Sequence, residues 1–471
     1  MISFGTGGWR AIIGEEFTKE NVQKLTLALA RRMKAENVAD KSFCIGYDRR
    51  FLSRQAAEWS AEVMAGEGIH TLMINREAPT PLIMFAVQTY DLPYGIAVTA
   101  SHNPALYNGV KLFTAGGRDA VETVTDELTV AANQVEVSEI KSCLYSQAVL
   151  TGLVEEINPQ NQYLDAIIRS VNMEAIRSRN LQIVLDPMYG VSRTSLQTIL
   201  LTARCDVTVI HERHDTLFGG RLPAPNVDTL GALQATVLED HADLGIATDG
   251  DADRLGIIDD KGRFVHPNEI LVLLYHYLLK YKKWRGPVVR NIATTHMLDR
   301  IAAEFGEKCY EVPVGFKHIS SGMQEHDAVI GGESSGGLTV RGHIHGKDGI
   351  YAAALLVEMI SVTGRKLSEL MKEIRQEYGE TFMVEWDGPF DQERRESLRQ
   401  LLMAERKLPE FPVAVVGVNY MDGCKVLFEN GWLIARFSGT EPRLRVFCEM
   451  PTRAEAWQMT GIMGDFLGLQ M

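Results

Sequence analysis

Short apolar segments alternate with longer amphipathic segments along most of the chain. Apolar runs bounded by turn residues, at 42–47, 69–74 and 94–98, predict buried strands. Residues 18–36, which begin at a threonine suited to cap a helix, and residues 53–66 predict the helices between these strands. Strands and helices that alternate at these lengths indicate parallel βαβ units, and therefore an α/β fold.

The same rhythm recurs in two further segments, and each of the three ends in a short strand that runs into a glycine-marked loop. A helix is expected at 227–239 in the second segment. The C-terminal segment differs, because a charged helix at 392–406 precedes a hairpin with strands at 424–428 and 432–437. We predict an α/β protein with four domains around a central cleft: three similar α/β mixed-sheet domains and a smaller α+β C-terminal domain. The expected bounds of the domains are 1–150, 151–258, 259–365 and 366–471.

Composition and charge exclude several classes of protein. With 471 residues, of which 45% are hydrophobic and 23% charged, each domain can bury a core. The net charge of −13 argues against nonspecific binding to nucleic acids or acidic membranes. The 6 cysteines are scattered and form no CxxC pair, which is typical of reduced thiols. No run approaches the ~20 apolar residues of a membrane span. From the scattered cysteines and the negative charge we expect a cytoplasmic protein with neither a nucleic-acid nor a membrane partner.

A serine stands where one of the predicted strands ends. The segment Thr99–Pro104 follows the apolar run 94–98, and its proline excludes a continuing helix or strand. The chain must therefore turn at Ser101, at an edge where α/β sheets bind ligands. A serine there is either a nucleophile or part of an ordinary turn. Residues Asp48–Arg50 end an earlier strand, and either reach the same edge or cap the next helix.

Three aspartates form the second candidate site. Asp249, Asp251 and Asp253 alternate along a loop between two apolar strands, so in an extended chain they point the same way. Three like charges held together need a cation or a proton, and ligands that offer only oxygen favour Mg²⁺. An EF-hand is excluded because Arg254 stands where that loop needs glycine. A solvated acidic turn is the alternative, and Arg254 is placed to hold a phosphate beside the metal.

A glycine-rich loop and two lysines suggest contacts to a phosphorylated polyol. The loop Gly331–Gly337 surrounds Glu333 and Ser335 with glycines that let a ligand approach the backbone closely. A hairpin with glycine bulges is the alternative. Lys317 and Lys347 each stand at the start of a predicted helix, where anions bind.

The last candidate loop resembles a phosphate cradle. Ser438, Gly439 and Thr440 offer hydroxyl and N–H groups, and Arg436 and Arg445 flank them with positive charge. The lysine pattern of a nucleotide P-loop is missing. The alternative is a turn with incidental arginines.

Taken together, these loops resemble the α-D-phosphohexomutase superfamily, which includes phosphoglucomutases, phosphomannomutases and phosphoglucosamine mutases. The similarity covers essentially the whole chain, in the loop order of the family. The main matching motifs are Thr99–Pro104 with Asn108–Lys111, Asp249–Arg254, Gly332–Gly337 and Arg436–Thr440. The supporting motifs are Phe4–Arg10, Pro79–Pro81, Asp186–Gly190 and Phe218–Gly220.

The resemblance implies an enzyme that moves a phosphoryl group between the two ends of a hexose monophosphate. A hexose 1,6-bisphosphate would be the intermediate and activator. Ser101 would be carried as phosphoserine, Arg10 would help to hold it, and Lys111 and His102 would be further catalytic residues. The implied Mg²⁺ ligands are Ser101, Asp249, Asp251 and Asp253.

The resemblance also bears on the sugar. Glu333 and Ser335 would contact the 3- and 4-hydroxyls. Ser334 replaces the glutamine typical of glucosamine enzymes, and Gly337 replaces the histidine typical of dual mannose/glucose enzymes. The implied substrate-binding residues are Arg254, Lys317, Glu333, Ser335, Lys347, Arg436, Ser438, Gly439, Thr440 and Arg445.

Glucose is therefore the expected sugar, with mannose and pentose phosphates as alternatives within the family. The only expected partner is the small-molecule sugar phosphate, and the expected state is a monomer or homodimer. Two other classes stay open: a metal-dependent serine phosphatase, which loses its phosphate to water, and a noncatalytic sensor of sugar phosphates.

Overall fold

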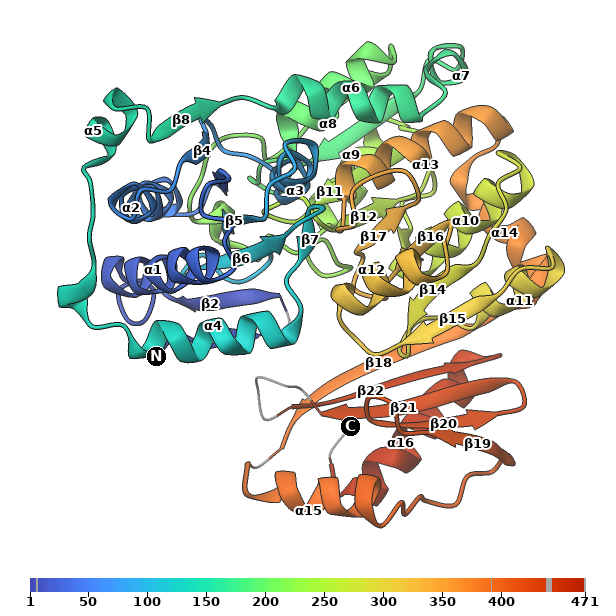
Figure 1. Ribbon diagram of the computed structural model, residues 1–471. Coiled ribbons are helices and arrows are strands. Elements are labelled where there is room, and N and C mark those ends of the chain that lie inside the picture. The colour runs from blue at the N-terminus through green and yellow to red at the C-terminus, as the bar shows by residue number, and fades with distance from the viewer. Residues whose placement is uncertain (6, 391, 438–442, 470–471) are drawn as a thin grey trace. The chain divides into compact units, whose positions relative to one another are not determined.

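The computed structural model describes residues 1–5, 7–390, 392–437 and 443–469. They form two compact units, one of Met1–Ile270 with Ser335–Ser368 and one of Leu271–Ser334 with Glu369–Met471. Four sheets and their helices make up these units (Figure 1). The predicted α/β fold with a distinct C-terminal domain is confirmed. No described helix is both long enough and apolar enough to cross a membrane.

The first sheet is mixed and carries the serine segment. Strands β3, β4 and β5 run parallel, and β6 pairs antiparallel with both β5 and β2. Helix α1 begins where the Thr18 side chain accepts a hydrogen bond from the N–H of Asn21, as its sequence predicts. The strands are β1 Phe4–Gly5, β2 Gly8–Ile12, β3 Phe43–Tyr47, β4 Thr71–Ile74, β5 Tyr94–Val98, β6 Tyr107–Thr114, β7 Arg118–Asp119 and β8 Val154–Ile157. The helices are α1 Lys19–Ala35, α2 Ser53–Gly66, α3 Thr80–Thr89, α4 Glu122–Gln134 and α5 Tyr145–Leu150.

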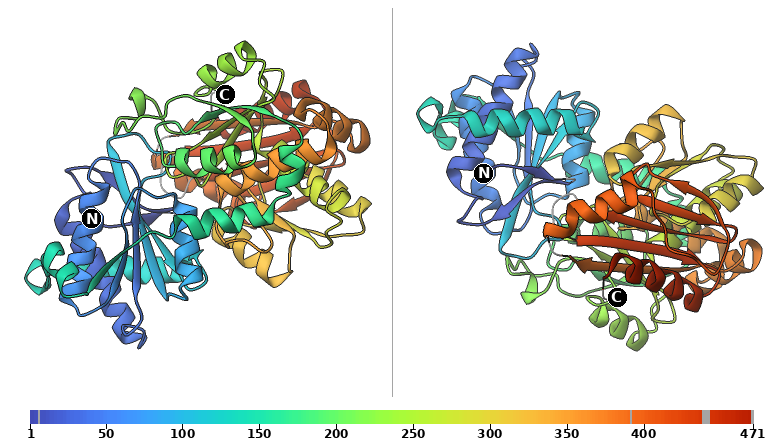
Figure 2. Two further views of the ribbon diagram at one scale, coloured as in Figure 1. Left: turned by 90° about the horizontal axis from the view of Figure 1, so that it is seen from above. Right: turned by 90° about the horizontal axis from the view of Figure 1, so that it is seen from below.

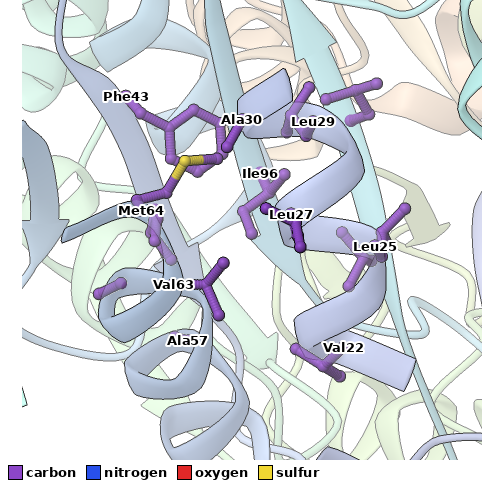
Figure 3. Close-up of a cluster of buried hydrophobic side chains, with 14 of the residues drawn as sticks. Val22, Leu25, Leu27, Leu29, Ala30, Phe43, Ala57, Val63, Met64 and Ile96 are labelled. Atoms are coloured by element: carbon purple, nitrogen blue, oxygen red, sulfur yellow. The ribbon is translucent and has the colours of Figure 1, made fainter. Parts of the chain in front are cut away.

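The apolar face of α1 packs on this sheet and on α2 (Figure 3). Leu25 and Leu29 of α1 share one buried cluster with Ile96 of β5 and Met64 of α2. Burial of each such side chain contributes about 1.5–3 kcal/mol. This core fixes β5, the strand that leads into Ser101.

The second sheet presents the acidic loop. Strand β9 lies between β10 and β11 in parallel, and β12 returns antiparallel to β11. Helix α9 covers Gly231–Glu239 rather than the predicted 227–239, because Asn226 Oδ1 accepts hydrogen bonds from the N–H groups of Asp228 and Thr229 and holds a turn there. The strands are β9 Gln182–Asp186, β10 Asp206–Val209, β11 Leu244–Thr248, β12 Leu255–Ile258 and β13 Phe264–Val265. The helices are α6 Gln160–Ser170, α7 Met173–Arg177, α8 Arg193–Thr202, α9 Gly231–Glu239 and α10 Pro267–Lys280.

In the second unit, β14 pairs in parallel with β15 and with β16. Strand β17 and helix α13 belong to the first unit. The strands of this part of the chain are β14 Val288–Asn291, β15 Cys309–Val312, β16 Ile330–Gly332 and β17 Leu338–Val340. The helices are α11 Met297–Glu304, α12 Phe316–Glu325, α13 Gly349–Thr363 and α14 Leu367–Tyr378.

The C-terminal sheet is antiparallel, with the order β18-β22-β21-β20-β19, and α16 packs on it (Figure 2). The predicted hairpin is confirmed as β20 and β21. The strands are β18 Phe382–Pro389, β19 Val415–Asn419, β20 Cys424–Phe428, β21 Gly431–Phe437 and β22 Arg443–Met450. The helices are α15 Arg395–Arg399 and α16 Arg453–Leu467.

The helix predicted at 392–406 is confirmed as a helical segment over residues 392–404, but it is not one regular α-helix. The segment consists of a 3₁₀ turn at Gln392–Arg394, helix α15 and a π turn at Gln400–Ala404. The guanidinium of Arg394 donates to the carbonyls of Leu467 and Gly468, which ties the first turn to the end of α16. Leu398 and Leu402 are also buried in the core of this domain.

Candidate active site

Ser101 lies in a tight turn directly after β5. Its φ of 50° is in the left-handed region, which a serine keeps only where its surroundings hold it. Its N–H donates to the Thr99 hydroxyl at 2.9 Å, and its Oγ donates to Asp249 Oδ2 at 2.7 Å. The predicted turn is therefore confirmed, and the buried hydroxyl points at the acidic loop.

Arg50 holds this turn through backbone carbonyls. Its Nη2 donates to the carbonyls of Ser101 and Asn103 at 2.6 and 2.7 Å. Its Nη1 donates to those of Pro104 and Tyr107 at 2.9 and 3.0 Å. One buried guanidinium thus satisfies four carbonyls and closes the loop from Ser101 to the start of β6.

Asp48 orients Arg50 in turn. Its Oδ1 accepts hydrogen bonds from the N–H of Arg50 and the hydroxyl of Ser53, and its Oδ2 accepts one from the hydroxyl of Thr99. Burial raises the pKa of Asp48, and the nearby positive charge of Arg50 opposes that rise. The sequence left open whether this pair reaches the site or caps α2. It reaches the serine loop, through the bonds of Arg50 to Ser101 and of Thr99 to Asp48. Among the described residues, Asp48 contacts the start of α2 only through the Ser53 hydroxyl, and no side chain caps that helix.

The three aspartates gather although the loop that carries them is not extended. The loop joins the antiparallel strands β11 and β12 and turns at Ala252, whose φ is 63°. The N–H of Ala252 donates to the carbonyl of Asp249 at 3.0 Å and closes the turn. The predicted extended chain is wrong, because the carboxylates converge through folding of the loop. One oxygen each of Asp249, Asp251 and Asp253 lies within 4.8 Å of the others.

This donor set suits a divalent cation. All three side chains are buried, and the Oδ1 atoms of Asp251 and Asp253 have no hydrogen-bond partner among the described residues. A buried carboxylate oxygen without a partner is unfavourable unless a cation meets it. Ligands that offer only oxygen are typical of Mg²⁺. The donor set therefore fits magnesium, and Ser101 Oγ, 2.7 Å from Asp249, is placed to be a fourth oxygen.

Two lysines pair with the aspartates. Lys111 Nζ, on β6, lies 2.6 Å from Oδ2 of both Asp251 and Asp253, and Lys347 Nζ lies 2.8 Å from the latter. Burial disfavours the ammonium of Lys111, but the carboxylates outweigh burial and raise its pKa. Burial and the neighbouring carboxylates raise the pKa of Asp249 to about 8. At Asp253, Lys111 and Lys347 outweigh burial and hold the pKa well below its usual value.

Further nitrogen groups surround Ser101. His102 Nδ1 lies 3.4 Å from Ser101 Oγ. The charge of Arg254, together with burial and the charge of Arg10, lowers the pKa of His102, so the ring is neutral at pH 7. The Nε atoms of Arg10 and Arg254 are buried and have no hydrogen-bond partner in the described part of the chain. Cationic groups with an unused donor suit an anion such as phosphate.

The first turns of two helices pack against the acidic loop. At the start of α3, the N–H of Thr80 donates to the carbonyl of Asp251 at 2.9 Å, and its hydroxyl donates to Asp251 Oδ2 at 2.6 Å. At the start of α13, the N–H of Gly349 donates to the carbonyl of Ala252 at 3.2 Å. The positive ends of both helix dipoles therefore stabilise the carboxylates.

The glycine-rich loop is divided between the units. In the second unit, Glu333 Oε1 accepts hydrogen bonds from the N–H of Gly315 and the side chain of Asn291 at 3.0 and 3.2 Å. Gly315 directly precedes α12, whose second residue is Lys317. Ser335 belongs to the first unit. Glu333 therefore lies beside the start of α12.

Two predicted members of the phosphate cradle, Arg436 and Arg445, lie in the C-terminal sheet. Arg436 of β21 and Arg445 of β22 are direct cross-strand partners. Arg436 pairs with Asp422 at 2.9 Å, and Arg445 pairs with Asp387 at 3.4 Å. The remaining predicted members lie outside the described residues: Ser438, Gly439 and Thr440.

The fold and the site together define an enzyme of the phosphohexomutase class, an intramolecular phosphotransferase. Models of all four phosphoglucomutase/phosphomannomutase domains match the chain in order, and it belongs to that family. The α/β/α domains I, II and III match residues 1–138, 161–262 and 266–378, and the C-terminal domain matches residues 399–460.

Individual relatives carry different sugars in their names. A Thermococcus kodakarensis protein named phosphoglucomutase/phosphomannomutase is 30% identical over 462 residues, which cover 96% of this chain and 95% of that protein. A probable phosphoglucosamine mutase of Pyrococcus furiosus is 30% identical and covers 97% of this chain and 95% of its own. The crystal structure of a putative phosphomannomutase from Thermus thermophilus is 28% identical, with a TM-score of 0.86 and 99% of both chains covered. These similarities establish the family and not the sugar.

Proposed function

We propose that this chain is a phosphoglucomutase, which interconverts glucose 1-phosphate and glucose 6-phosphate. The observation that carries the proposal is the buried group formed by Ser101, the three aspartates and Lys111. Phosphoryl transfer depends mainly on alignment and on neutralising charge. This group supports both, because Ser101 Oγ is fixed 2.7 Å from Asp249 and two lysines and two arginines lie around it.

In the proposed reaction Ser101 carries a phosphoryl group that Arg10 and Arg254 hold. A sugar hydroxyl oxygen attacks the phosphorus, the bond between phosphorus and Ser101 Oγ breaks, and a hexose 1,6-bisphosphate forms. This bisphosphate reorients and returns its other phosphate to Ser101 by the reverse exchange. Lys111 is the proposed proton donor to the leaving Oγ, and the neutral His102 is the proposed acceptor of the proton from the attacking hydroxyl.

The aspartates are the proposed metal ligands. Asp249, Asp251 and Asp253 would hold Mg²⁺ together with Ser101. When bound, the cation offsets the negative charge of the phosphate.

A remote phosphate site supports both orientations of the sugar. Arg436 and Arg445, with Ser438, Gly439 and Thr440, are proposed to hold the phosphate that does not react. If this site binds the phosphate in both orientations of the sugar, either end of the ring can face Ser101, and one nucleophile can react at both ends.

Two features favour glucose over the other sugars of the family. Ser334, following Glu333, replaces the glutamine of glucosamine enzymes. At Gly337 an added Cβ would lie 2.2 Å from Cδ of Lys347, so a larger side chain there, such as the histidine of dual-specificity enzymes, would displace this lysine. Lys317 and Lys347 are proposed to contact the substrate as in glucose-type members, and Glu333 and Ser335 to bind the 3- and 4-hydroxyls.

The proposal is tested by measuring turnover with Mg²⁺ and a trace of hexose 1,6-bisphosphate. Glucose 1-phosphate, mannose 1-phosphate, glucosamine 1-phosphate and ribose 1-phosphate are compared side by side, with Ser101→Ala as the control. We expect conversion of the glucose compound to its 6-phosphate to be fastest and to vanish in the control. Faster conversion of another sugar would overturn the choice of glucose. Release of free phosphate without isomerisation would indicate a phosphatase instead.

A further inference from the structure

Tyr163, His343 and Asp348 form a buried hydrogen-bonded cluster in the first unit, here called the cap cluster. The Tyr163 hydroxyl donates to Asp348 Oδ2 at 2.7 Å, and His343 Nε2 lies 2.6 Å from the same oxygen. A carboxylate only accepts hydrogen bonds, so Nε2 carries the proton. The His343 side chain is 5% exposed and that of Asp348 is fully buried.

The second oxygen of Asp348 caps helix α13. Asp348 Oδ1 accepts hydrogen bonds from the N–H groups of Ile350 and Tyr351, both at 2.9 Å. The carboxylate therefore has four donors and a single orientation. Its negative charge also lies at the favourable end of the helix dipole.

The ring of His343 lies beside two tyrosine rings. Its centroid lies 4.4 Å from that of Tyr351 and 6.3 Å from that of Tyr163. Burial and the Asp348 carboxylate raise the pKa of Tyr163, so this hydroxyl remains a donor. Nε2 of His343 is engaged by Asp348, so this nitrogen is not available to a substrate.

The start of α13 touches the acidic loop of the site. The N–H of Gly349 donates to the carbonyl of Ala252 at 3.2 Å, and an added Cβ on Gly349 would lie 2.6 Å from the carbonyl oxygen of Arg254. Lys347 directly precedes Asp348, and its Nζ lies 2.8 Å from Asp253 Oδ2. A shift of the helix start would therefore move the Lys347 backbone relative to the acidic loop.

We propose that His343 is a positioning residue that acts on the reaction through Asp348 and Lys347. The inference rests on the proposed function, in which Lys347 contacts the sugar phosphate. By fixing Asp348, the cap cluster sets the first turn of α13, and that turn directs the lysine across Gly337 to Asp253. His343 does this without contacting the reacting atoms.

A double-mutant cycle between His343→Leu and Lys347→Met tests the proposal. We expect His343→Leu to lower kcat/KM about tenfold, chiefly through KM, because Lys347 is the proposed substrate contact. In the Lys347→Met background the same substitution should change kcat/KM less than about twofold. His343→Gln, whose amide nitrogen can donate to Asp348, should restore most of the loss, and the matched control His345→Gln should have no effect. Additive effects in the cycle would show a merely structural role and overturn the proposal.

Two further measurements keep the test decisive. Tyr163→Phe removes only one hydroxyl, so it reports on the cap cluster even if His343→Leu folds poorly. In the Lys347→Met background, Tyr163→Phe should likewise change kcat/KM less than about twofold. Amide hydrogen exchange at Gly349–Tyr351 needs no substrate and should accelerate in His343→Leu and Tyr163→Phe. Unchanged exchange would overturn the proposal. If the wild type prefers another sugar phosphate, the proposed function fails, and the cycle is run with that sugar.

Discussion

Arg50 shows how one side chain sets the geometry of the nucleophile. Its guanidinium donates to four carbonyls of the serine loop, including that of Ser101 itself. The left-handed φ of Ser101 is unfavourable for a serine, so the surrounding hydrogen bonds have to maintain it. The position of the hydroxyl therefore depends on a residue that has no role in the chemistry.

Arg50→Lys should weaken both folding and catalysis. A lysine ammonium is a single point and cannot reach four carbonyls, and each buried carbonyl left unpaired costs about 1–3 kcal/mol. We expect the free energy of unfolding to fall by about 2–4 kcal/mol and kcat to fall roughly hundredfold. Urea unfolding and steady-state kinetics measure these losses. The control Arg54→Lys, an exposed arginine paired with Glu58, should show neither, and an unchanged kcat in Arg50→Lys would remove Arg50 from the positioning of Ser101.

Asp251→Asn should weaken binding of Mg²⁺. Its Oδ1 has no hydrogen-bond partner among the described residues, as expected of an oxygen reserved for a cation. We expect the affinity for Mg²⁺ in calorimetric titration to fall about tenfold or more, and activity to fall with it. The exposed Asp206→Asn is the control. An unaltered titration would exclude Asp251 from the metal site.

At the residue scale the sequence predicted groups with a motif and missed groups without one. Ser101 and Asp249 were found because a proline and a repeated carboxylate mark their loops. The sequence offered Asp48–Arg50 as residues that could reach the same sheet edge, but it did not give the role of Arg50, because its partners are backbone carbonyls, which any residue supplies. The hydrogen bonds that His343 and Tyr163 donate to Asp348 likewise follow no spacing rule in the sequence.

At the element scale, helix α10 carries a buried histidine. His276 is surrounded edge-on by the rings of Tyr281, Phe305 and Tyr378, and its Nε2 has no hydrogen-bond partner among the described residues. Burial, together with the charge of Lys280, lowers its pKa to about 4. The His276 ring is therefore neutral in the folded protein at neutral pH.

This histidine should make the protein acid-sensitive. The unfolded chain takes up a proton near pH 6.5 and the folded chain only near pH 4, so stability falls as the pH falls between these values. One pKa unit corresponds to about 1.4 kcal/mol, so the loss is roughly 3 kcal/mol. His276→Phe should flatten the pH dependence of urea unfolding in this window. The exposed His241→Asn should not, and an equally steep dependence in His276→Phe would assign the acid sensitivity to other groups.

The bounds of helices and strands were predicted well where the hydrophobic periodicity and the capping residues agree. They were predicted poorly where tertiary contacts determine the local structure. The cap of α1 at Thr18 is local, and so the start of this helix was found. The acidic loop was predicted to be extended, since nothing local shows that Ala252 turns the chain. The bonds from Arg394 to the end of α16, far away in the sequence, were likewise not predicted.

At the scale of the whole molecule, a buried ionic network joins two domains within the second unit. Lys425 of β20 is fully buried, and its Nζ contacts the carbonyl of Ile292, the ring of His296 and the carboxylate of Glu311. Arg290 of β14 binds the same carboxylate. The alternation of strands and helices along the chain predicted four domains. It could not predict that Lys425 pairs with Glu311, because these residues lie far apart in the sequence.

Lys425→Met should weaken this connection more than any exposed charge does. Removing one partner leaves the others buried and incompletely paired, which costs about 3–5 kcal/mol. In calorimetry we expect the C-terminal domain to melt earlier, as a separate transition. The exposed Lys407→Met, which breaks a surface pair with Glu405, should leave the curve unchanged. The apolar cluster of Ile292, Trp432 and Ile434 also spans these domains. A melting curve unaffected by Lys425→Met would therefore mean that apolar packing alone holds the two domains together. Because apolar packing is not directional, the C-terminal domain could then rotate against its neighbour.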